Sequence, residues 1–128
     1  MSIPNDIVVI EDDTIMREAL AEWLGGAGYR VRTVADGAAG LAAVAVSVPA
    51  LVITDMHMPG MNGSTVIAEL KQRHPDISII AISGLFSSGY GIDADATVAL
   101  GAARALAKPF KRAELLSAVR EVLGSRAT

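Results

Sequence analysis

Acidic, hydroxyl and amino side chains stand directly after four short apolar runs in this sequence. In chain order they are Glu11, Asp12 and Asp13 after residues 7–10, Asp55 after 51–54, Ser83 after 77–82, and Lys108 after 105–107. Continuous apolar runs of this length are typical of strands that are covered on both faces. The carboxyl ends of parallel strands meet at one edge of a sheet, where ligands bind. We therefore expect these side chains to share one site.

The chemistry of this set is that of a divalent cation and a phosphoryl group. Neighbouring carboxylates repel one another and raise each other's pKa values unless a cation joins them. Oxygen donors of this kind favour Mg²⁺ that keeps several of its waters. One carboxylate can also attack phosphorus and form an aspartyl phosphate. The transfer needs mainly positioning and charge neutralisation, which a metal ion, the Lys108 ammonium group and the Ser83 hydroxyl can supply.

Helical patterns separate the apolar runs. Apolar residues recur at three- and four-residue spacing in the segments 14–27, 64–74 and 111–123, and a further helix opens at Asp36–Gly37 and runs to about Val46. Asp13 or Thr14 can cap the first helix, and Ser64 can cap the third.

The remaining segments complete a repeated pattern of strand and helix. Residues 30–34 are more polar and suit an edge strand, and a Gly- and Ser-rich loop over 84–97 precedes a short helix near 96–101. Five strand–helix repeats with right-handed crossovers predict a parallel sheet with helices on both faces.

The composition restricts the class of protein. A chain of 128 residues with 52% hydrophobic residues is long enough for one domain with its own core. Its formal net charge of -3 argues against direct binding of nucleic acid or of anionic lipid. The lack of cysteine excludes disulfides and thiolate zinc sites. The N-terminus does not resemble a signal peptide, and the apolar stretch 38–53 is broken by Pro49, so we expect a cytoplasmic protein with no membrane segment.

Five segments of the chain resemble a CheY-like response-regulator receiver domain. They are residues 8–13, 35–37, 51–63, 80–84 and 108–110. The most specific is Asp55–Gly63, in which Met-Pro-Gly follows the aspartate and Asn-Gly closes the segment. The resemblance implies a flavodoxin-like α/β fold, with a doubly wound five-stranded parallel sheet of order 2-1-3-4-5 and five helices. It also implies a single receiver domain over residues 1–128.

The resemblance implies a role for each matching residue at the strand ends. Asp55 matches the phosphoacceptor, Asp12 the direct metal ligand, Glu11 the acid that holds the metal through water, and the main-chain carbonyl of His57 the third protein ligand. We expect the His57 side chain to point to solvent.

Lys108 and Ser83 match the other two groups of the family's site. The resemblance implies that Lys108 meets the phosphoryl group and that the Ser83 hydroxyl moves toward it. The Lys108–Pro109 peptide is typically cis in this family. We interpret Asp13 as a helix cap or a solvated acid.

Two departures from the family pattern concern signalling and phosphoryl lifetime. Ala105 stands three residues before Lys108, where many members carry Tyr or Phe, so we expect the loop after Ser83, with Phe86 and Tyr90, to carry the signal. His57 and Leu85 flank the path of the hydrolytic water in the family, which predicts a fairly long-lived phosphoryl group.

The function implied is that of a switch in two-component signal transduction. A histidine kinase or histidine phosphotransfer protein would phosphorylate Asp55, and the modified domain would change its contacts with a downstream protein. The chain ends just after the last helix, so we expect either a single-domain regulator or a receiver excised from a longer protein whose output domain is missing.

Three alternatives deserve comparison with this interpretation. An adaptor-type receiver that is never phosphorylated is disfavoured by the acids and Lys108, although Ala105 mildly favours it. A haloacid-dehalogenase-type phosphatase needs a second Asp where His57 stands. A dinucleotide-binding enzyme needs a Gly-rich turn where residues 11–13 stand. We therefore expect no enzyme activity beyond the domain's own phosphorylation and dephosphorylation.

Overall fold

The computed structural model describes residues 3–84, 97–98 and 100–124 of the chain. Within them a five-stranded sheet has the order β2-β1-β3-β4-β5, and all the paired strands are parallel. The strands are β1 (Ile3–Ile10), β2 (Arg30–Val34), β3 (Pro49–Asp55), β4 (Ser78–Ser83) and β5 (Arg104–Ala107). The predicted strand order and the edge position of residues 30–34 are both confirmed.

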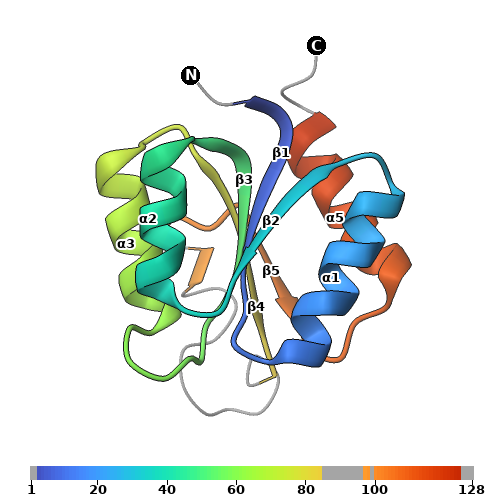
Figure 1. The fold of residues 1–128 in the computed structure, drawn as a ribbon, viewed down its shortest axis with the longest axis horizontal. Coiled ribbons are helices and arrows are strands. Elements are labelled where there is room, and N and C mark those ends of the chain that lie inside the picture. The colour runs from blue at the N-terminus through green and yellow to red at the C-terminus, as the bar shows by residue number, and fades with distance from the viewer. Residues whose placement is uncertain (1–2, 85–96, 99, 125–128) are drawn as a thin grey trace.

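Helices cover the sheet on both sides, as the repeated strand–helix pattern predicts. The described helices are α1 (Thr14–Gly26), α2 (Gly37–Val46), α3 (Gly63–Arg73) and α5 (Arg112–Gly124). Figure 1 shows α2 and α3 on one face of the sheet, and α1 and α5 on the other. The loop expected over 84–97 lies outside the described residues except at its two ends, residues 84 and 97. Of the short helix expected near 96–101, Thr97 and Val98 are helical, and the Leu100 and Gly101 amides donate to the Thr97 and Val98 carbonyl oxygens at 3.2 and 3.0 Å.

The central strands divide the core into two layers because successive side chains point to opposite faces. Ile7 and Val9 of β1 pack in the cluster that also contains Leu20 of α1 and Leu115 of α5. Val8 and Ile10 pack in the other cluster, with residues of α2 and α3. This two-sided burial explains the nearly continuous apolar runs in β3, in β4 and in residues 7–10 of β1.

Short polar side chains begin three of the helices. Asp13 caps α1 by accepting from the Met16 amide at 2.8 Å, and Asp36 caps α2. The prediction that Ser64 caps α3 is wrong, because Asn62 accepts from the Thr65 amide at 3.0 Å and the helix begins at Gly63. Ser64 therefore lies inside the first turn. In the described part of the chain, no helix combines the length and the apolar character needed to cross a bilayer.

Candidate functional site

The register of the sheet brings the predicted strand ends to one edge. Ile10 lies beside Thr54, Asp55 beside Ile82, and Ser83 beside Ala107. The residues that follow or end β1, β3, β4 and β5 therefore meet at the carboxyl edge of the sheet. This placement is the one expected of Asp55, Ser83, Lys108 and the acids after β1.

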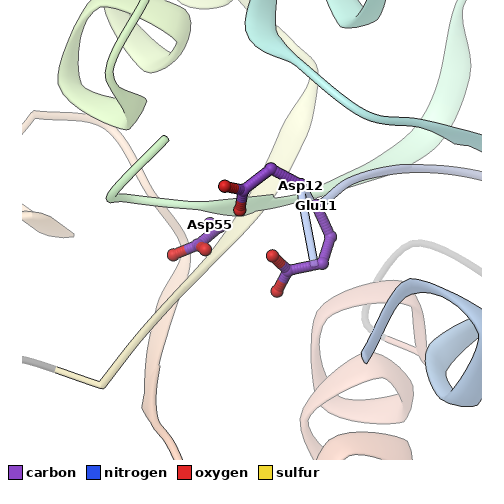
Figure 2. A group of neighbouring side chains, drawn as sticks. All are labelled: Glu11, Asp12 and Asp55. Carbon is purple, nitrogen blue, oxygen red and sulfur yellow. The ribbon is translucent and has the colours of Figure 1, made fainter. Parts of the chain in front are cut away.

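Three carboxylates gather at this edge. Glu11 and Asp12 follow β1 and Asp55 ends β3, and one oxygen atom from each lies within 4.8 Å of the others (Figure 2). Glu11 is fully buried, Asp55 is 5% exposed, and Asp12 is exposed. Buried carboxylates this close to one another are unfavourable unless positive charge offsets them.

Lys108 supplies part of that positive charge. Its Nζ lies 2.8 Å from Glu11 Oε1 and 3.2 Å from Asp55 Oδ2. Burial by itself lowers the pKa of Lys108, but the hydrogen bond to Glu11 and the charge of Asp55 outweigh it, so the pKa is raised. Lys108 therefore stays protonated and links the acids of two strands.

The fold strongly raises the pKa of Glu11. Burial raises the pKa of Glu11 to about 7, although hydrogen bonds from Lys108 and from the Asp13 amide favour the ionised form. The Asp13 amide donates to Glu11 Oε2 at 3.2 Å. A nearly neutral pKa means that this carboxyl group is poised to release its proton when more positive charge arrives.

Two neighbouring residues donate hydrogen bonds to Asp55. The His57 amide donates to Asp55 Oδ1 at 3.2 Å, and the Thr54 hydroxyl donates to the Asp55 carbonyl oxygen at 3.0 Å. Gly63 packs so closely that a Cβ there would lie 2.8 Å from that carbonyl oxygen and 2.5 Å from Met56 Cα. The N-terminus of α3 can approach the aspartate only because residue 63 is glycine.

The donor set fits a hard divalent cation. Once Glu11 is ionised, three carboxylates against one ammonium group leave two negative charges uncompensated at the edge of the sheet. All the donors are oxygen atoms, and the exposure of Asp12 leaves room for retained water, as Mg²⁺ prefers. Glu11, Asp12 and Asp55 are thus the residues that would hold the ion, with the His57 carbonyl as the further candidate.

The other predicted residues have clear positions around the carboxylates. Ser83 is buried at the end of β4, and its carbonyl oxygen accepts from the Lys108 amide at 2.8 Å. His57 is exposed, as expected, and the Lys108–Pro109 peptide is cis. Ala105 lies half-buried on β5 beside Ala81, whereas Phe86, Tyr90 and Leu85 are outside the described residues.

Arg17, which the sequence patterns did not single out, contacts the loop that carries Glu11 and Asp12. Its guanidinium group donates to the Glu11 carbonyl oxygen at 2.9 Å. A cation in the first turns of a helix is unfavourable for the helix dipole. An arginine at this position, four residues after the acidic triplet Glu11–Asp13, could therefore have indicated that its guanidinium group binds a nearby acceptor.

Comparison with known proteins identifies the family. The model of the response regulator receiver domain matches residues 7–120. The chain belongs to this family. Among its relatives, the DNA-binding transcriptional regulator NtrC of Escherichia coli K12 is 34% identical over 118 residues, which are 90% of this chain and 24% of NtrC. The transcriptional regulatory protein FixJ of Azorhizobium caulinodans is 35% identical over 119 residues, covering 93% of this chain and 55% of FixJ.

Solved structures agree with this assignment. The receiver domain of NtrX from Brucella abortus superposes with a TM-score of 0.86 at 30% identity, covering 93% of this chain and 98% of that one. A putative response regulator from Chloroflexus aurantiacus gives a TM-score of 0.85 at 30% identity, covering 95% and 99%. This receiver domain spans about a quarter of NtrC and about half of FixJ.

Membership in the receiver-domain family indicates what the acidic cluster does. The chain is a receiver domain of the two-component response regulators, which are signalling modules. Such domains typically bind Mg²⁺ at an acidic cluster, and here Glu11, Asp12 and Asp55 form one. Related response regulators are typically phosphorylated by histidine kinases.

Proposed function

We propose that this receiver domain accepts a phosphoryl group on Asp55 from a histidine kinase or a histidine phosphotransfer protein. The observation that carries the proposal is the contact of Lys108 with the carboxylates of both Glu11 and Asp55. A buried aspartate beside two further acids and a lysine has the charge balance that phosphoryl transfer to a carboxylate requires.

The transfer forms one bond and breaks another. An oxygen of the Asp55 carboxylate attacks the phosphorus of a phosphohistidine, and the P–O bond forms as the P–N bond breaks. The electron pair of the P–N bond leaves with the donor's imidazole nitrogen, and the ring departs neutral when its other nitrogen carries a proton. The His57 amide donates to Asp55 Oδ1, and the Gly63 amide donates to the carbonyl oxygen of the next residue, Met56, so these backbone contacts would hold Asp55 in place during the transfer.

The surrounding residues neutralise the charge of the incoming group. Mg²⁺, when bound by Glu11, Asp12, Asp55 and the His57 carbonyl, would offset negative charge on the phosphoryl oxygens. Lys108 is 3.2 Å from Asp55 Oδ2 and can turn from the carboxylate to a phosphoryl oxygen. Ser83 ends the neighbouring strand and can donate its hydroxyl hydrogen to another.

The output that we propose is a change in protein contacts. A phosphoryl group adds negative charge and strong acceptor oxygens beside β4 and β5, and the domain then binds or releases a downstream protein. We propose one receiver domain over residues 1–128, in the cytoplasm, with no direct contact to nucleic acid or membrane and no substrate other than its own Asp55.

An adaptor that is never phosphorylated is the second candidate. Ala105 favours it, because alanine offers no aromatic ring to report the state of Ser83. In the adaptor, Asp55 and Lys108 would act only as a structural ion pair.

Incubation with acetyl phosphate and Mg²⁺ separates the two. We expect intact-protein mass spectrometry to show the gain of one phosphoryl group, lost in Asp55→Asn and on chelation of the metal. Asp76→Asn, which changes an exposed acid between α3 and β4, is the matched control and should react like the wild type. A wild-type protein that gains no phosphoryl group from acetyl phosphate or from a phosphorylated histidine donor would favour the adaptor.

A further inference from the structure

Arg17 holds the backbone of the loop that carries two of the three carboxylates. Its Nη1 donates to the Glu11 carbonyl oxygen at 2.9 Å and makes a longer contact of 3.5 Å with the Asp12 carbonyl oxygen. The side chain is half-buried, and its own amide makes the first hydrogen bond of α1, to the Asp13 carbonyl oxygen at 2.9 Å. Arg17 therefore ties the beginning of α1 to the end of β1.

Arg17 and Lys108 contact different kinds of oxygen atom. Lys108 contacts carboxylate oxygens, which are the atoms that a metal ion needs. Arg17 contacts the main-chain carbonyl oxygens of Glu11 and Asp12 and makes no contact with their carboxylates. It places positive charge behind the loop without competing for the ligand atoms.

Asp12 depends most on this support. Within the described part of the chain, the Asp12 carboxylate makes neither a hydrogen bond nor an ion pair, and the residue is exposed. Glu11, in contrast, is held by Lys108 and by the Asp13 amide. The direction of the Asp12 side chain is thus set mainly by the peptide planes on either side of it.

We propose that Arg17 is a positioning residue for the divalent cation, acting through the main chain of Glu11 and Asp12. The inference rests on the proposed metal site and adds a residue that touches neither the ion nor the phosphoryl group. Partners that orient metal ligands from behind typically contribute ten- to hundredfold in metal affinity. We expect the loss in Arg17→Met to be about tenfold, at the lower end of that range, because Glu11 keeps its other contacts.

The test measures Mg²⁺ binding to the unphosphorylated full chain by isothermal titration calorimetry. Arg17→Met keeps the aliphatic stem and removes the donors, and Arg17→Lys keeps the charge without the planar fork. We expect Arg17→Met to bind Mg²⁺ about tenfold more weakly and Arg17→Lys to fall in between. Arg120→Met removes an exposed arginine of α5 and should bind like the wild type.

Phosphorylation from acetyl phosphate provides a second readout that a merely structural role would not move. The Mg²⁺ concentration for half-maximal rate should rise in Arg17→Met by the same factor as the dissociation constant, while the rate at saturating Mg²⁺ stays close to that of the wild type. Circular dichroism checks the fold, and Arg17→Gln replaces Arg17→Met should the latter fail to fold.

The outcomes separate this inference from the proposed function. Equal Mg²⁺ affinity in folded Arg17→Met and wild type overturns the role of Arg17 alone. A wild type that binds no Mg²⁺, or binds it unchanged in Asp12→Asn, overturns the metal site and with it both proposals. A lower rate at saturating Mg²⁺ with unchanged affinity would also overturn the positioning role.

Discussion

Lys108 Nζ lies 2.8 Å from Glu11 Oε1, across 97 residues of sequence, and this ion pair joins the ends of β1 and β5 beside the candidate phosphoacceptor. Before any phosphoryl group arrives, the positive charge of Lys108, which phosphoryl transfer requires, is already bound to the Glu11 carboxylate. Because Lys108 also contacts Asp55 at 3.2 Å, its ammonium group can shift between partners without leaving the site.

The pKa of Glu11 predicts a pH-dependent metal site. Burial raises it from 4.5 to about 7, so the folded protein binds more protons than the unfolded chain between these values. Its contribution to the free energy of unfolding is therefore fully present below pH 4.5 and is lost as the pH rises to about 7. Mg²⁺ needs the ionised carboxyl group, so its affinity should rise with pH up to about 7 and then level off.

Calorimetric Mg²⁺ titrations below and above that pH check this expectation. Glu11→Gln should bind more weakly, with little dependence on pH. Histidine also changes charge in this range, so His57→Gln, beside the site, is the matched control and should keep the wild-type dependence. A wild-type affinity that does not change with pH would contradict the role assigned to Glu11.

Asp12 and Asp13 are adjacent acids with separate tasks. Asp13 caps α1, so Asp13→Ala should lower the free energy of unfolding by about 1 kcal/mol and leave Mg²⁺ affinity unchanged. Asp12 is exposed, so Asp12→Ala should change stability by less than about 0.5 kcal/mol and weaken Mg²⁺ binding by about tenfold or more. Urea unfolding and calorimetry measure the two quantities, and equal effects of both variants on metal binding would refute this division.

Gly63 sets the distance between α3 and Asp55. In Gly63→Ala the new methyl group would lie 2.5 Å from Met56 Cα and 2.8 Å from the Asp55 carbonyl oxygen, so the backbone must move. We expect a loss of about 1–3 kcal/mol in stability and slower phosphorylation from acetyl phosphate. Gly25→Ala on α1, where an added Cβ would meet no neighbouring element within 4 Å, is the control and should be neutral or gain up to about 1 kcal/mol. A Gly63→Ala protein with wild-type stability and rate would show that the approach is not required.

Arg32 has a structural task at the opposite edge of the sheet. It pairs with buried Asp6 at 2.9 Å and donates to the carbonyl oxygens of Ala43 and Ser47 at the end of α2. Arg32→Met leaves Asp6 buried without its partner and should cost about 2–4 kcal/mol, with no change in Mg²⁺ affinity. Arg30→Met, on the same strand but exposed, should stay within about 0.5 kcal/mol, and a similar loss in both variants would contradict the pairing.

Local sequence patterns were sufficient for the elements and for part of the capping. Asp13 was one of two candidates for the cap of α1, beside Thr14, and the structure confirms it. Asp36 stood at the predicted opening of the second helix and caps α2. Ser64 was the wrong choice for α3, since Asn62 and Ser64 are both good caps. The helix begins at Gly63, whose amide donates to the Met56 carbonyl oxygen at 3.1 Å, and the choice between two cap residues in the sequence does not reveal that contact.

The sequence by itself determined the sheet and the convergence of Asp12, Asp55, Ser83 and Lys108, because strand–helix repeats with one handedness send all parallel strand ends to the same edge. Only the tertiary structure decided that Glu11 is fully buried, with a raised pKa, and that Lys108 joins it to Asp55. It also decided that Arg17 turns back onto the loop after β1 and that Arg32 holds Asp6. Burial and the reach of long cationic side chains depend on which surfaces pack together in space, and no local pattern encodes that.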